Sequence, residues 1–144
     1  MGIPFEQRNF QKELDKKIAG FQKDGIVPTL LLHSCCAPCS SYCLSYLADY
    51  FKITIFYYNP NIYPEDEFQK RLKEQQRLIK EMKLDINIIE GIYEYDTYLK
   101  SIQGLEKNGE RSKRCYNCYE LRIMRTFESV SYTHLRAHET SLHL

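Results

Sequence analysis

The chain has 144 residues, of which 43% are hydrophobic and 27% are charged, with a net charge of +1. These fractions are near globular averages, so they favour one folded domain over a disordered chain, and the charge gives no bulk attraction to nucleic acids or membranes. The sequence contains no apolar run near the ~20 residues that span a bilayer, and its N-terminus lacks the apolar core of a signal peptide. We therefore expect a cytoplasmic protein without a membrane partner.

The first third of the chain contains a helix, a strand and a second helix. Apolar residues spaced three or four apart predict an amphipathic helix over 5–22. The continuous apolar run over 29–34 is typical of a buried parallel strand. Pro38 suits the first turn of a helix that we expect to continue to about Tyr50.

The alternation continues along the chain. Residues 52–58 are β-branched and aromatic, which predicts a second strand, and 85–90 predict a third. Between them, 64–83 begin with proline and acidic residues and predict a helix. We expect 91–109 to form a loop, with or without a short helix, before a helix that begins at the second cysteine group. Alternating strands and helices favour an α/β domain with a parallel sheet and right-handed crossovers.

The six cysteines fall into two groups. The stretch "LLLHSCCAPCSSYC" holds Cys35, Cys36, Cys39 and Cys43, and "RCYNCYEL" holds Cys115 and Cys118. The first group follows a predicted strand and opens a predicted helix. Ligands bind beyond the carboxyl ends of strands in open α/β sheets, and helix N-termini stabilise thiolates. The first group therefore lies where this architecture places chemistry, although we expect Cys43 to be a buried packing residue.

Clustered cysteines in a reducing compartment are more often metal ligands or catalytic thiols than structural disulfides. Two thiolates from each group would make a four-thiolate site, which suits zinc or an iron–sulfur cluster. The adjacent Cys35 and Cys36 favour the cluster, because neighbouring thiolates can reach different irons of a [4Fe–4S] cube. A dithiol redox site is a third possibility, but it leaves one cysteine group unexplained.

Three stretches resemble the epoxyqueuosine reductase QueH family: "LLLHSCCAPCSSY", "FYYNPNIYPEDEFQKRL" and "RCYNCYELR". The resemblance implies reduction of the epoxide of epoxyqueuosine in tRNA to queuosine, the last step of queuosine biosynthesis. It implies that Cys35, Cys36, Cys115 and Cys118 ligate a [4Fe–4S] cluster, with Cys39 near or bound to an additional mononuclear iron. The partners would be the anticodon loop of a queuosine-type tRNA and an unidentified electron donor. The alternative is a non-catalytic zinc-binding module for tRNA or protein.

The expected fold is a Rossmann-like or HUP-like α/β domain over 1–128, with a parallel sheet that is incomplete at its C-terminus. The resemblance also implies a later cysteine pair, and no cysteine follows Cys118 here, so we expect cluster binding with poor or no substrate reduction. The segment 129–144 differs in composition, since three of the four histidines lie in the last eleven positions. We interpret it as a non-native tail.

Other polar residues are open to two interpretations. The tyrosines and asparagines of "YYNPNIY" either contact substrate or pack in a turn, and His33 is more typical of a strand-end histidine bonded to the backbone. The basic residues that flank the second cysteine group are better placed to meet an anionic substrate near the cluster. They are Arg111, Lys113, Arg114, Arg122 and Arg125.

Overall fold

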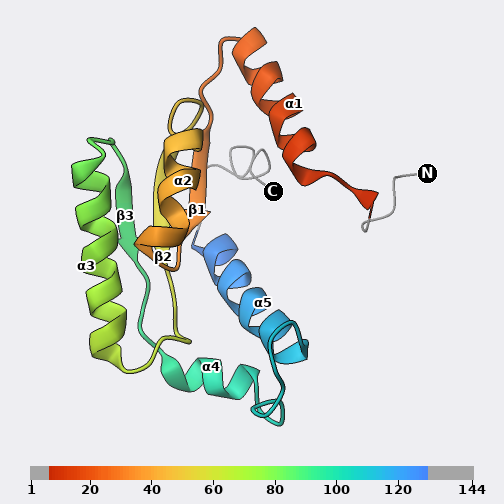
Figure 1. The fold of residues 1–144 in the computed structure, drawn as a ribbon, viewed down its shortest axis with the longest axis vertical. Coiled ribbons are helices and arrows are strands. Elements are labelled where there is room, and N and C mark those ends of the chain that lie inside the picture. Colours follow the sequence, from red (N-terminus) through yellow and green to blue (C-terminus); the bar gives the residue numbers. More distant parts are fainter. Residues whose placement is uncertain (1–6, 130–144) are drawn as a thin grey trace.

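The structure is a computed structural model that describes residues 7–129. Helices and strands alternate along most of the chain (Figure 1). The elements are α1 (Phe10–Lys23), β1 (Thr29–His33), α2 (Ala37–Leu47), β2 (Lys52–Tyr57), α3 (Glu65–Glu81), β3 (Asn87–Glu90), α4 (Tyr95–Ser101) and α5 (Lys113–Glu128). The predicted α/β architecture is confirmed. Within the described residues, no helix is both long and apolar enough to cross a membrane.

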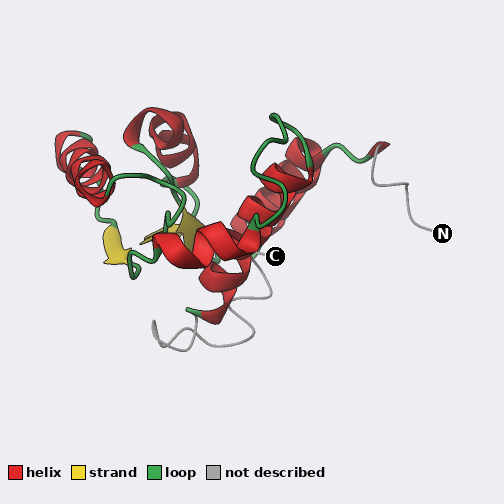
Figure 2. Cartoon of the chain, turned by 90° about the horizontal axis from the view of Figure 1, so that it is seen from below, coloured by secondary structure: helices red, strands yellow, loops and turns green. Residues whose placement is uncertain are grey.

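The three strands form one parallel sheet in the order β1-β2-β3. Leu30 pairs with Ile53, and Ile55 pairs with Ile88, which fixes the register across the sheet. Both crossovers step in the same direction, so α2 and α3 cover the same face, as Figures 1 and 2 show. The carboxyl ends of the three strands point toward α4 and α5 (Figure 1).

The core lies between the sheet and the helices. Its main cluster joins buried residues of α1, α2, α3 and the sheet: Ile18, Leu44, Leu47, Phe51, Ile53, Ile55 and Ile79. A second cluster lies near the carboxyl end of β2 and contains Tyr57, Ile62, Phe68 and Leu72. Full burial of a large apolar side chain stabilises a fold by about 1.5–3 kcal/mol. The second cluster therefore supports the strand end that leads into the functional edge of the sheet.

Some predicted boundaries differ from the structure by a few residues. Helix α2 ends at Leu47 rather than near Tyr50, because the N–H groups of Tyr50 and Phe51 both donate to the Leu47 carbonyl in a turn. Helix α3 ends at Glu81, and Lys83 follows with φ 55°, a left-handed conformation that does not continue a helix. The short-helix option for 91–109 is the one observed, as α4.

Candidate metal centre

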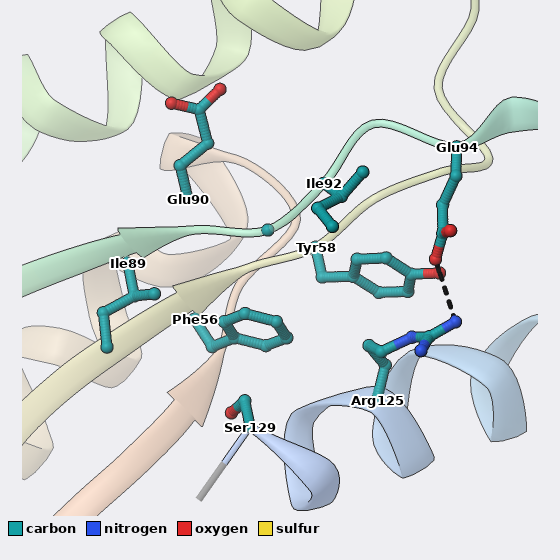
Figure 3. Close-up of a pocket in the computed structure, with 9 residues that line it drawn as sticks. Phe56, Tyr58, Ile89, Glu90, Ile92, Glu94, Arg125 and Ser129 are labelled. Atoms are coloured by element: carbon teal, nitrogen blue, oxygen red, sulfur yellow. Dashed lines mark hydrogen bonds and ion pairs between the residues drawn. The ribbon is translucent and has the colours of Figure 1, made fainter. Parts of the chain in front are cut away.

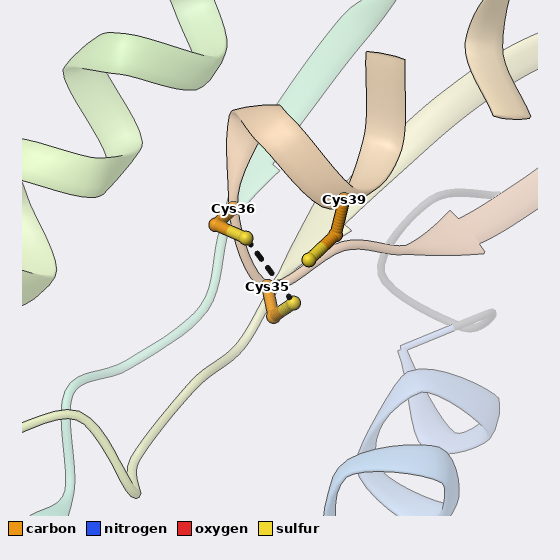
Figure 4. A group of neighbouring side chains, drawn as sticks. All are labelled: Cys35, Cys36 and Cys39. Carbon is orange, nitrogen blue, oxygen red and sulfur yellow. Dashed lines mark hydrogen bonds between the residues drawn. The ribbon is translucent and has the colours of Figure 1, made fainter. Parts of the chain in front are cut away.

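Three thiols lie together at the junction of β1 and α2. Cys35 and Cys36 follow the last residues of the strand, and Cys36 is the N-cap of α2 with extended backbone angles. Cys39 lies on the first turn of the helix. The sulfur atoms of Cys35, Cys36 and Cys39 all lie within 4.8 Å of one another (Figure 4). Thiolates at this spacing can hold a metal ion, so the first cysteine group forms a compact candidate site.

Hydrogen bonding within the trio distinguishes the three thiols. Burial acts to raise the pKa of Cys36, but hydrogen bonds from the side chain and backbone of Cys39 and from Cys35 bring that pKa below its ordinary value. Donation to Cys36 raises the pKa of the exposed Cys39 thiol to about 11. Burial, and then donation to Cys36 over 3.7 Å, raises the pKa of Cys35. Cys36 is thus the thiol that most readily becomes the thiolate that a metal requires.

A buried network of hydrogen bonds holds the cysteine loop, the segment from Ser34 to Ser40 that carries the trio. The Oγ atoms of Ser34 and Ser40 donate to Oε1 of Gln75 on α3, over 2.8 and 2.9 Å. Asn59, which follows β2, donates from Nδ2 to the Ser34 carbonyl over 2.9 Å. Gln75 and Asn59 have no exposed surface. The network fixes the backbone on both sides of the trio, because Ser34 precedes Cys35 and Ser40 follows Cys39.

Gln75 was not predicted from the sequence, although its position in α3 carries a signal for it. The apolar stripe of α3 runs through Phe68, Leu72 and Ile79, and Gln75 occupies the position between the last two. A glutamine at a core position needs buried partners, because a buried polar group without hydrogen bonds is costly. Its Oε1 accepts from the two serines of the cysteine loop, whereas its Nε2 has no hydrogen-bond partner among the described residues.

The second cysteine group lies on the first turns of α5. Ser112 caps this helix by accepting from the Arg114 N–H. Cys115 and Cys118 are half-buried and are not among the three thiols that lie within 4.8 Å of one another. Burial raises the pKa of Cys118, while the charge of Arg122 opposes this rise. Arg122 also acts to lower the pKa of Cys35, so one guanidinium lies within electrostatic reach of both cysteine groups.

A hollow of about 250 Å³ lies between two thiols of the trio, Cys35 and Cys39, and α5. Cys35, Cys39 and Cys43 line it on one side, and Tyr119, Arg122 and Ile123 line it on the other. The prediction that Cys43 is a buried packing residue is wrong, since the side chain is exposed. The core-facing side of α2 is formed by Ser40, Leu44 and Leu47 instead, and Cys43 points into this hollow with Cys39.

A comparison with sequence families shows which family the chain belongs to. A sequence model described as "Epoxyqueuosine reductase QueH" matches residues 30–144. The chain belongs to the QueH family. It is 38% identical over 121 residues to the epoxyqueuosine reductase QueH of Staphylococcus epidermidis, covering 80% of this chain and 51% of that protein.

Two further QueH relatives give similar results. The Streptococcus pyogenes protein is 31% identical over 131 residues, which cover 88% of this chain and 51% of the relative. The Haemophilus influenzae protein is 39% identical over 100 residues, which cover 69% of this chain and 40% of the relative. The chain thus spans about half the length of the first relatives or less. The family match extends through 130–144, the larger part of the predicted tail, and these residues lie outside the described part of the structure.

His33 and the tyrosine-rich loop after β2 lie close to the site. His33 lines the hollow, and its Nε2 donates to the Tyr58 carbonyl over 2.7 Å, which confirms the prediction of a strand-end histidine bonded to the backbone. Of the tyrosine-rich loop, Tyr57, Tyr58 and Asn59 are buried, so the packing interpretation holds for them. Tyr63 is 70% exposed and does not follow that pattern.

A second cavity of about 320 Å³ lies at the carboxyl ends of β2 and β3 (Figure 3). Its apolar wall includes Phe56 and Ile89. At its rim, the hydroxyl of Tyr58 and Nη2 of Arg125 both donate to Oε1 of Glu94, the latter over 2.9 Å. This three-residue contact joins α5 to the segment after β3 and was not predicted from the sequence. It holds the helix that carries the second cysteine group against the sheet edge.

Proposed function

We propose that this protein takes part in the reduction of the epoxide of epoxyqueuosine in tRNA to queuosine. The reaction cleaves both C–O bonds of the epoxide, forms a C=C bond and releases the oxygen as water. It consumes two electrons and two protons. The observation that carries the proposal is the compact thiol trio at the carboxyl end of β1, in a chain of the QueH family. The substrate would be the anticodon loop of a queuosine-type tRNA, and the electron donor is unidentified.

We propose that Cys35, Cys36, Cys115 and Cys118 hold a [4Fe–4S] cluster. The donor set fits this group, because thiolates are the usual ligands of such clusters. Two observations support the set: Cys36 has a lowered pKa, and Arg122 lies within electrostatic reach of both Cys35 and Cys118. When bound, a cluster supplies electrons one at a time, which no carboxylate or histidine can do.

The chain's own residues would position the substrate. Cys39 is exposed, lies beside Cys36 and faces the hollow, so it is the thiol best placed to bind or adjoin an additional iron. The buried network would keep the loop in one conformation while groups bind, since both serines on either side of the trio are hydrogen-bonded to Oε1 of Gln75 in the interior. A cytoplasmic location would keep these thiols reduced.

One observation favours the alternative of a zinc-binding module. The sulfurs of Cys35 and Cys36 lie 3.7 Å apart. Zn–S bonds of ~2.3 Å in a tetrahedron place neighbouring sulfurs about 3.8 Å apart. The observed spacing therefore suits two ligands of a single ion, whereas thiolates bound to two different irons of a [4Fe–4S] cube lie farther apart, so the two side chains would have to separate to bind a cluster.

Anaerobic reconstitution with iron and sulfide distinguishes the two functions. The cluster proposal expects a brown protein with broad absorption near ~400 nm and loss of iron on Cys→Ser substitution at each of the four ligands. Cys43→Ser is the matched control, because Cys43 lies on the same hollow but outside the ligand set. A colourless protein that retains one zinc and no iron would overturn the cluster and support the zinc module.

A further inference from the structure

The hollow between α2 and α5 contains an arginine held in a defined position. Nε of Arg122 donates to the Cys118 carbonyl over 3.2 Å. Its guanidinium carbon lies 4.8 Å from the centre of the Tyr119 ring, as in a cation–π contact. These two contacts use one N–H and one face of the guanidinium. The guanidinium also hydrogen-bonds the Cys118 side chain, and because it has five N–H donors, donors remain for a group that enters the hollow.

The charge of Arg122 is not neutralised by a carboxylate within the described part of the chain. Four other arginines, Arg8, Arg71, Arg77 and Arg125, each form an ion pair with a glutamate. The lining of the hollow contains no aspartate or glutamate. A positioned guanidinium without an acidic partner, at the rim of a hollow, is suited to bind a phosphate.

Tyr119 adds an aromatic surface beside this charge. The Tyr119 side chain is 61% exposed, although Arg122 covers one face of its ring. An exposed ring next to a positive charge is the combination that single-stranded nucleic acids require: bases stack on the ring and phosphates bind the cation. Such stacking does not need a particular base, because every base has a π-face.

We propose that this hollow binds one nucleotide of single-stranded RNA, with its base stacked on Tyr119 and a flanking phosphate on Arg122. The site rests on the proposed function, because it would hold an anticodon-loop nucleotide next to the one that reacts. Cys35 and Cys39 line the same hollow, so an adjacent nucleotide would face these thiols. Among the basic residues near the second cysteine group, Arg122 is thus the one that would bind a phosphate, and Tyr119 would stack on the base.

The test is fluorescence anisotropy with the whole chain and a labelled RNA hairpin that has the sequence of a queuosine-type anticodon arm. Tyr119→Ala should weaken binding about tenfold, while Tyr119→Phe should keep the affinity within about twofold, because the ring is what stacks. Arg122→Gln should weaken binding and reduce the slope of log K against log salt by about 0.7–1, and Arg122→Lys should restore the slope.

Two matched controls remove the same groups elsewhere. Tyr42→Ala removes a tyrosine that is 74% exposed on α2, and Arg77→Gln removes a positive charge that is paired on α3. Neither residue lines the hollow, so both variants should bind RNA as the unsubstituted chain does. Iron content and absorption of each variant show separately whether the cluster is present.

Equal RNA affinity for Tyr119→Ala, Arg122→Gln and the unsubstituted chain would overturn the RNA site while leaving the proposed function intact. That result would also be expected if a protein covers this face of α5. No measurable binding of the hairpin by the unsubstituted chain would overturn the RNA site as well. Loss of the cluster in the unsubstituted chain would count against the proposed function, and the hairpin titration would still test the site.

Discussion

Ser34 and Gln75 form a hydrogen bond in the interior, 41 residues apart in sequence, with Oγ of Ser34 donating to Oε1 of Gln75 over 2.8 Å. The same oxygen accepts from Ser40. One glutamine of α3 therefore binds both ends of the loop that presents the thiol trio. The position of Cys35, Cys36 and Cys39 thus depends on Gln75, which is hydrogen-bonded to the neighbouring serines and not to a cysteine sulfur.

The first prediction concerns this glutamine. Gln75→Leu should lower the free energy of unfolding by about 1–3 kcal/mol, because the buried Ser34 hydroxyl loses its acceptor, whereas the Ser40 hydroxyl keeps two backbone carbonyls as acceptors. Urea unfolding followed by circular dichroism measures the change. Gln76→Leu is the control, since Gln76 is exposed on the same helix. An unchanged unfolding midpoint for Gln75→Leu would show that the Ser34 hydroxyl finds another acceptor and that the network is not needed.

The network shows why some features of this protein could be predicted from the sequence and others could not. The strands and long helices follow from apolar periodicity and turn residues, which are local properties. Gln75 interrupts the stripe of α3, but its partners come from β1 and α2, so only the packed fold identifies them. The prediction for Cys43 was wrong for a related reason. Its spacing from Cys39 shows that the two residues share one side of the helix, but it does not show which side of the helix faces the core.

A second prediction concerns metal removal. Metal binding to the proposed ligands in the folded chain should stabilise the fold, because the unfolded chain has no preformed site. At a metal concentration about 100 times the Kd, the gain is about 2.7 kcal/mol. A chelator should therefore lower the melting temperature of the loaded protein, and Cys36→Ser should abolish the difference. Cys43→Ser should retain it, and its loss in that variant would place Cys43 among the ligands.

A third prediction concerns the contact between Arg125 and Glu94. The ion pair is partly exposed, so its own contribution is small, but Glu94 also accepts from the buried Tyr58 hydroxyl. Glu94→Ala should cost more than Arg125→Ala, because it leaves that hydroxyl without its acceptor. Urea unfolding of both single variants and the double variant should show coupling of at least about 0.5 kcal/mol.

The control for this cycle is Glu120→Ala, which removes an exposed glutamate from the same helix. It should be additive with Arg125→Ala. Additivity of the Glu94 and Arg125 substitutions would mean that α5 is held against the sheet edge by other contacts.

A fourth prediction concerns alkaline pH. Burial is the largest cause that raises the pKa of Tyr57 and of Tyr58 to about 12, whereas an unfolded tyrosine has a pKa of about 10. Between these values the unfolded chain binds fewer protons than the folded chain, so the stability falls as the pH rises. The contribution is complete below about pH 10 and is lost as the pH rises through about 12.

The measurement compares urea unfolding at about pH 9 and about pH 11, on either side of the unfolded tyrosine pKa. Tyr57→Phe should show a smaller loss of stability between the two than the unsubstituted chain, because one raised phenol is gone. Tyr42→Phe, at an exposed position, should show the full loss. An equal loss in Tyr57→Phe would mean that other groups cause the alkaline decline.

The closeness of the trio has a consequence for handling the protein in air. Cys36-Ala37-Pro38-Cys39 is itself a C-x-x-C sequence at a helix N-terminus, and its first thiol has a lowered pKa. Low-pKa thiols at helix starts react fastest with oxidants, and a neighbouring thiol then closes a disulfide. Protein purified without a reductant should therefore lose two titratable thiols from the 36–39 stretch first, and with them its capacity to be loaded with metal.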